Sequence, residues 1–139
     1  MNDRFDLQRF VDAQDPVIER VRTELRNGRK TSHWMWFVFP QISGLGRSDT
    51  ARRYAIYGQD EAKAYLAHPV LGARLKECTE IVNLIEGRSA HDIFDFPDDK
   101  KFHSSMTLFS AVAPHEEVFA QALQKYFGGE PDRMTIERL

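Results

Sequence analysis

LGARLKECTEIVNLI, residues 71–85, is the stretch that decides the fold class of this chain. Its apolar residues stand at steps of four, three, four and three: Leu71, Leu75, Cys78, Val82 and Ile85. This spacing places them on one face of an α-helix and predicts that the face is buried in a core. Because Cys78 falls within the stripe, we interpret it as a small packed hydrophobe and not as a nucleophile.

Helical spacing recurs on both sides of this stretch. It predicts helices around residues 7–11, 18–25, 51–55, 60–66, 102–109 and 118–126, with shorter turns at 89–94 and 131–139. Candidate helix starts are Asn2 or Asp3, Asp15-Pro16, Ser48 or Asp49, Asp60, Ser89, Pro114 and Asp132. Strand-like alternation is nearly absent. We therefore predict a mainly α protein, a single compact multihelical domain over residues 1–139 with about seven helices and short connections.

Composition limits the functional classes. The chain has 139 residues, 42% hydrophobic and 29% charged, as in a folded globular protein, and its net charge of −2 does not favour nucleic acid. No apolar run is long enough for a membrane span, and the charged start is unlike a secretory signal. With a single cysteine, we expect a cytoplasmic protein.

Metal and cofactor sites are not indicated. The five histidines are His33, His68, His91, His103 and His115, and no two of them have a metal-ligand spacing. We expect neither a metal nor a cofactor.

The segment from His33 to Ser48 holds both tryptophans, Trp34 and Trp36, within an apolar run that ends at Pro40. Periodicity does not decide whether residues 34–39 form a buried strand or a buried helical turn. His33, Trp34, Trp36 and Gln41 offer flat faces and polar tips, while Gly44, Gly46 and the helix start near Ser48 could bring amides to an anion. In the alternative interpretation both tryptophans are core residues and the glycines only form a turn.

Positive charge precedes this segment. Arg29 and Lys30 follow a helix that already carries Arg20, Arg22 and Arg26. They form either a solvated face or an anion site beside the aromatic residues.

A second polar cluster runs from Asp98 to Thr107. Asp98 or Asp99 could cap a helix or act as a general base, next to Lys100 and Lys101. The hydroxyl side chains that follow are Ser104, Ser105 and Thr107. They could line a pocket or allow close helix packing.

Several motifs together resemble the DUF1810 family, small bacterial proteins of unknown function. The matching residues are Gly28-Arg29-Lys30, His33 to Gln41, Gly44-Leu45-Gly46, Glu61-Ala62, Tyr65-Leu66, Leu71, Arg74-Leu75, Asp98-Asp99-Lys100 and Ser104 to Phe109. The family motif more often runs Asp-Asp-Leu-Lys, which makes Lys101 the candidate equivalent of its lysine. The resemblance implies a mainly helical single domain and no particular activity.

Two functional hypotheses follow. The first is a pocket between the His33–Ser48 segment and the Asp98–Thr107 helix that binds a nucleotide-like or other anionic small molecule. If the ligand is hydrolysed, Asp98, Asp99 and His33 are the candidate catalytic residues, and Arg29, Lys30 or Lys101 would hold its charge. The alternative is a non-catalytic module for protein interaction or self-association as a homo-oligomer.

Overall fold

The apolar stripe predicted over residues 71–85 forms a buried helix up to Val82, whereas Ile85 follows the end of the helix and is half-buried. In the computed structural model, which describes residues 3–139, helix α6 spans Leu71–Leu84. Leu71, Leu75, Cys78 and Val82 are buried along it. Burial raises the pKa of the Cys78 thiol to about 12, which keeps the thiol protonated at neutral pH.

Ten helices and no strand lie within the described residues 3–139. They are α1 (Gln8–Gln14), α2 (Ile18–Arg26), α3 (Met35–Val38), α4 (Asp49–Arg53), α5 (Gln59–Ala67), α6 (Leu71–Leu84), α7 (Ala90–Phe94), α8 (Asp98–Val112), α9 (Glu117–Phe127) and α10 (Arg133–Glu137). The mainly α class is confirmed, but the expected number of about seven is too low. The additional helices α3, α7 and α10 have only four or five residues each, and α7 and α10 lie where the sequence predicted shorter turns.

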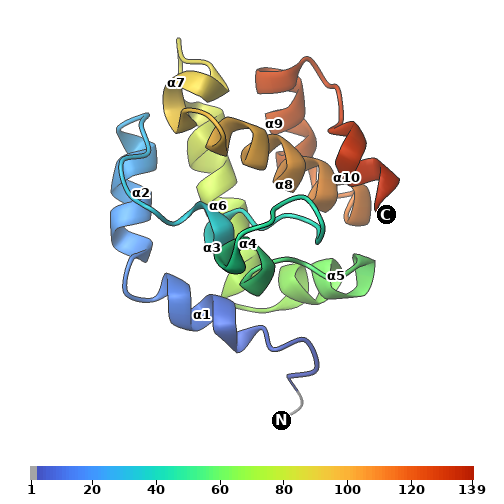
Figure 1. Cartoon of the computed structure of the whole chain (residues 1–139). Helices are drawn as coiled ribbons and strands as arrows, with labels where there is room; N and C mark the ends of the chain where they lie inside the picture. Colours follow the sequence, from blue (N-terminus) through green and yellow to red (C-terminus); the bar gives the residue numbers. More distant parts are fainter. Residues whose placement is uncertain (1–2) are drawn as a thin grey trace.

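The helices share one hydrophobic core. Helix α8 packs against α9, α5, α7 and α10, and α6 packs against α9, α5 and α2 (Figure 1). Phe102 of α8 lies in an aromatic cluster, with ring centroids 4.7 Å from Phe94 and 5.1 Å from Phe39. Phe39 directly follows α3, so the aromatic run of the sequence is anchored on α8.

Residues 34–39 adopt the helical-turn alternative, as α3. After this turn the chain forms an isolated parallel bridge between Ile42 and Ile56. The amide of Ser43 donates to the carbonyl of Ile56, and the amide of Ile56 donates to the carbonyl of Gln41, each at 2.8 Å. The bridge thereby joins the two ends of the segment 42–56, which contains the loop and α4.

Three predicted helix caps are confirmed. Ser48, Ser89 and Asp132 each accept a hydrogen bond from an amide of the helix that follows, at α4, α7 and α10. Asp3 accepts from the amides of Leu7 and Gln8 ahead of α1, and Asn2 lies outside the described residues.

A new helix does follow Asp15-Pro16, as predicted, but Asp15 does not cap it and Pro16 is not its first residue. Asp15 keeps helical dihedral angles at the end of α1, and its carboxylate pairs with Arg74 at 2.9 Å. Helix α2 then begins at Ile18 without a side-chain cap.

Among the described residues, no helix has the length and apolarity needed to cross a membrane.

Candidate functional site

The two tryptophans have different environments. Trp34 is 1% exposed, and its indole N–H donates a 2.9 Å hydrogen bond to the buried carboxylate of Glu24. Its face is therefore part of the core. Trp36 is only half-buried and lines a hollow at the surface.

The carboxylate of Glu24 has a strongly altered pKa. Burial by itself raises this pKa, but hydrogen bonds from the Ser32 hydroxyl, the Thr31 amide, the Trp34 indole and the Ser32 amide outweigh it and lower the pKa to about 2. Glu24 therefore stays ionised and fixes the turn that leads into α3.

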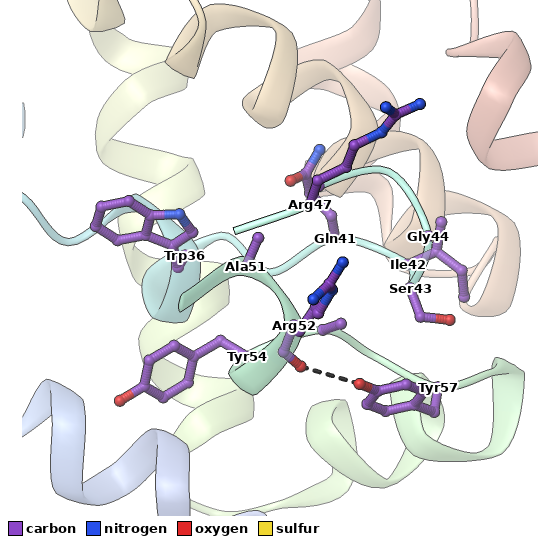
Figure 2. Close-up of a pocket in the computed structure, with 12 residues that line it drawn as sticks. Trp36, Gln41, Ile42, Ser43, Gly44, Arg47, Ala51, Arg52, Tyr54 and Tyr57 are labelled. Atoms are coloured by element: carbon purple, nitrogen blue, oxygen red, sulfur yellow. Dashed lines mark hydrogen bonds between the residues drawn. The ribbon is translucent and has the colours of Figure 1, made fainter. Parts of the chain in front are cut away.

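The hollow beside Trp36 has a volume of about 450 Å³ and is built around the loop between α3 and α4. Its wall consists of Trp36, Gln41, Ile42, Ser43, Gly44, Gly46, Arg47, Ala51, Arg52, Tyr54, Ala55 and Tyr57. Figure 2 shows Trp36, Arg52 and Tyr57 arranged around the loop that runs from Gln41 to Arg47. The Tyr57 hydroxyl donates a 3.0 Å hydrogen bond to the carbonyl of Arg52, so two residues of the wall are joined directly. We call this hollow the tryptophan pocket.

Buried charges hold one wall of the tryptophan pocket. The Arg9 guanidinium donates to the carbonyls of Arg53 and Ala55 at 2.8 and 2.9 Å and pairs with Glu61 at 2.8 Å. Glu61 in turn accepts from the amide of Tyr57 at 2.9 Å. The segment 53–57 is thus fixed from helices α1 and α5.

A side chain is disfavoured at both Gly44 and Gly46, but for different structural reasons. Gly44 has a φ of +94°, and a Cβ added there would lie 2.3 Å from a guanidinium nitrogen of Arg138. A Cβ at Gly46 would lie 2.5 Å from the Cβ of Ala51 in α4. The loop can therefore approach both α4 and the C-terminal segment closely.

The two predicted regions meet at Asp98. The Lys30 ammonium lies 2.8 Å from one Asp98 oxygen, and the Lys101 ammonium lies 3.5 Å from the other. Lys101 also lies over the Trp36 ring, 4.7 Å from its centroid. The cap predicted at Asp98 is not formed: Asp98 is the first residue of α8, Pro97 precedes it, and the helix has no side-chain cap. Asp99 accepts a hydrogen bond from the amide of Lys100.

A second hollow, of about 420 Å³, lies between the same loop and α8. Its wall consists of Gln41, Leu45, Gly46, Pro97, Lys100, Lys101, His103, Ser104, Asp132 and Met134. We call it the methionine pocket. Gln41 and Gly46 line both pockets, which makes the two hollows neighbours across this loop.

Comparison with known proteins identifies the family. The sequence profile of the family described as "Protein of unknown function (DUF1810)" matches residues 4–139. The chain belongs to the DUF1810 family. Its structure is similar to the crystal structure of the conserved hypothetical protein Rv1873 from Mycobacterium tuberculosis, at 55% sequence identity and a TM-score of 0.97 over 99% of this chain and 98% of the other. A search of curated proteins found no match.

In this DUF1810 protein the three hydroxyl residues of α8 are all buried. The Ser104 hydroxyl donates to Asp132, and the Thr107 hydroxyl accepts from the Asp132 amide, so both attach the segment before α10. Ser105 is fully buried, and its hydroxyl has no hydrogen-bond partner among the described residues. Of the three, Ser104 also lines the methionine pocket.

The remaining predicted residues are spread over the surface. His33 and Arg29 are exposed and line neither pocket. Asp99 lies 3.5 Å from the exposed His91 ring. Ser48 is exposed and caps α4. No group of three or more potential metal-ligating His, Cys, Asp or Glu residues occurs within residues 3–139.

Of the twelve residues that line the tryptophan pocket, Trp36, Gln41, Gly44 and Gly46 were predicted from the sequence. The other eight were not, and the polar or aromatic side chains among them include Arg47, Arg52, Tyr54 and Tyr57. Arg47 directly follows Gly46, which is a local signal for an anion near the loop. The other three come to the pocket through the Ile42–Ile56 bridge, a long-range contact with no signature in periodicity.

Proposed function

We propose that the tryptophan pocket binds a small molecule that carries a planar ring and a phosphate or carboxylate group, as a nucleotide does. The observation that carries this proposal is the pocket wall, which combines the half-buried Trp36 with Arg47, Arg52 and the backbone of the Gly44–Gly46 loop. An indole can stack on a flat ring, and a guanidinium can bind phosphate through two parallel hydrogen bonds. A volume of about 450 Å³ is in the range of small-molecule sites.

The charge of the wall favours an anion. None of the twelve lining residues is acidic, whereas Arg47 and Arg52 are both exposed. The nearest carboxylate to Arg52 is Asp49, 4.0 Å away and fully exposed. Both guanidinium groups are therefore available to a ligand.

We propose binding without hydrolysis. The candidate catalytic residues Asp98, Asp99 and His33 do not line the tryptophan pocket. Asp98 is moreover held by Lys30 and Lys101. A general base must reach the proton that it removes, directly or through one water molecule.

A thermal-shift experiment tests the proposal. The protein is heated with AMP, GMP, CMP, UMP, ribose 5-phosphate or inorganic phosphate, each at millimolar concentration. Because binding to the folded state raises Tm by mass action, we expect the nucleotides to raise Tm more than ribose 5-phosphate and inorganic phosphate, which lack the planar base. If no nucleotide changes Tm, the proposal is wrong.

Two neighbouring arginines provide a matched pair of variants. Arg52 lines the tryptophan pocket, whereas Arg53, on the same helix and also exposed, does not. A lost charge-assisted hydrogen bond costs about 1.5–3 kcal/mol, so Arg52→Ala should weaken AMP binding at least ten-fold. Arg53→Ala removes the same charge and should leave the affinity nearly unchanged.

The rival hypothesis of a non-catalytic interaction or self-association module makes a different prediction. It expects no nucleotide binding and a molecular mass that rises with protein concentration. Light scattering over a hundred-fold range of concentration separates the two hypotheses. A constant monomer mass together with a nucleotide-dependent Tm would favour the pocket.

A further inference from the structure

The methionine pocket has a chemical character of its own. Leu45, Pro97 and Met134 form apolar walls, and Lys100 and Lys101 stand beside them. Its one carboxylate, Asp132, accepts hydrogen bonds at Oδ2 from the Ser104 hydroxyl and from the amide and hydroxyl of Thr135, and the two lysines outnumber it. Lys100 is exposed, and its ammonium has no salt-bridge partner within residues 3–139. The pocket therefore suits an apolar group that is attached to an anion.

The two pockets are adjacent at Gly46. Gly46 lines both, and because it has no side chain, only backbone separates them at this position. Cationic residues lie on both sides, with Arg47 in the tryptophan pocket and Lys101 in the methionine pocket. Lys101 also contacts the Trp36 ring. An anionic group placed at Gly46, where the two pockets adjoin, would lie near positive charge in each pocket.

We infer that the two pockets bind the two ends of one ligand, a nucleotide-like phosphate diester. The inference rests on the proposed function of the tryptophan pocket and adds the class of ligand. The ring lies against Trp36, the phosphate lies at Gly46 between Arg47 and Lys101, and an apolar substituent on the phosphate fills the methionine pocket. A monophosphate without this substituent binds too, but it leaves the apolar walls of Leu45 and Met134 in water.

Three probes test the inference by isothermal titration: AMP, the methyl ester of AMP and the phenyl ester of AMP. The two esters have the same charge and differ only in the apolar group. We expect the phenyl ester to bind about ten-fold more tightly than the methyl ester, because its ring is removed from water. Equal affinity of the two esters overturns the inference but leaves the proposed function intact. Absence of binding by all three probes refutes the proposed function and this inference with it.

Helix α10 provides a matched pair of variants. Met134 and Ile136 are both exposed apolar residues, at 56% and 46%, but only Met134 lines the pocket. Met134→Ser should abolish most of the preference for the phenyl ester and leave the affinity for AMP unchanged. Ile136→Ser should retain the preference. If both substitutions reduce the preference equally, or neither does, the substituent does not lie in the methionine pocket and the inference is wrong.

Discussion

The indole N–H of Trp34 donates a 2.9 Å hydrogen bond to the carboxylate of Glu24, and both side chains are buried. The same carboxylate accepts from the amides of Thr31 and Ser32 at 2.7 and 3.1 Å. One ionised group therefore ties the end of α2 to the start of α3. Since Trp36 lies on α3, the position of the tryptophan pocket depends on this contact.

Replacement of Glu24 should be strongly destabilising. In Glu24→Ala the buried Trp34 indole and the partly buried amides of Thr31 and Ser32 lose their acceptor, and a donor left without a partner away from water costs about 1–3 kcal/mol. We expect a total loss of about 3–5 kcal/mol, which urea unfolding would measure. Glu24→Gln keeps one acceptor oxygen and should lose less. Glu19→Gln, at an exposed site on α2, is the control and should change stability by less than about 0.5 kcal/mol.

The same carboxylate should make stability depend on pH in the acid range. Its pKa is about 2 in the folded protein and 4.5 ordinarily, so the unfolded chain binds more protons between these values. The stabilisation from Glu24 is thus fully present above about pH 4.5 and is lost as pH falls toward 2. Urea unfolding at a series of pH values should show a shallower acid slope for Glu24→Gln than for the parent. Identical slopes would contradict the low pKa.

The different environments of Trp34 and Trp36 show what the sequence could predict and what it could not. In a strand, residues two apart lie on the same face, whereas in a helical turn they lie on nearly opposite faces. The sequence of residues 34–39 was compatible with a strand and with a helical turn. Only the helical turn, α3, places the Trp34 indole in the core and the Trp36 indole in the wall of the tryptophan pocket. By contrast, the stripe from Leu71 to Val82 extends over three turns, and its burial was predictable.

The Lys30–Asp98 pair connects the two regions of the candidate site and should show energetic coupling. The ammonium and carboxylate are 2.8 Å apart, with side chains only 9% and 17% exposed. We expect a coupling of about 1–2 kcal/mol in a double-mutant cycle with Lys30→Ala and Asp98→Ala, measured by urea unfolding. Asp49 and Arg52 provide the control cycle, since they are 4.0 Å apart and exposed. Their coupling should stay below about 0.5 kcal/mol. Equal coupling energies in the two cycles would show that burial does not strengthen the interaction between Lys30 and Asp98.

The contact between Gly44 and Arg138 leads to a prediction about loop geometry. Gly44→Ala adds a Cβ both to a backbone at φ +94° and to a position 2.3 Å from the Arg138 guanidinium. The backbone strain costs about 1 kcal/mol, and displacement of the guanidinium adds to it. We expect a loss of about 2 kcal/mol in the free energy of unfolding, measured in urea.

Two further variants separate the two causes. Gly87 has a similar φ of +74° but nothing within 4 Å of its added Cβ, so Gly87→Ala reports the backbone strain alone. In Gly44→Ala combined with Arg138→Ala the guanidinium is absent, and the loss should fall to the value for Gly87→Ala. If the double variant is no more stable than Gly44→Ala, Arg138 moves aside without cost. In that case the C-terminal segment does not restrain the loop that lines the tryptophan pocket.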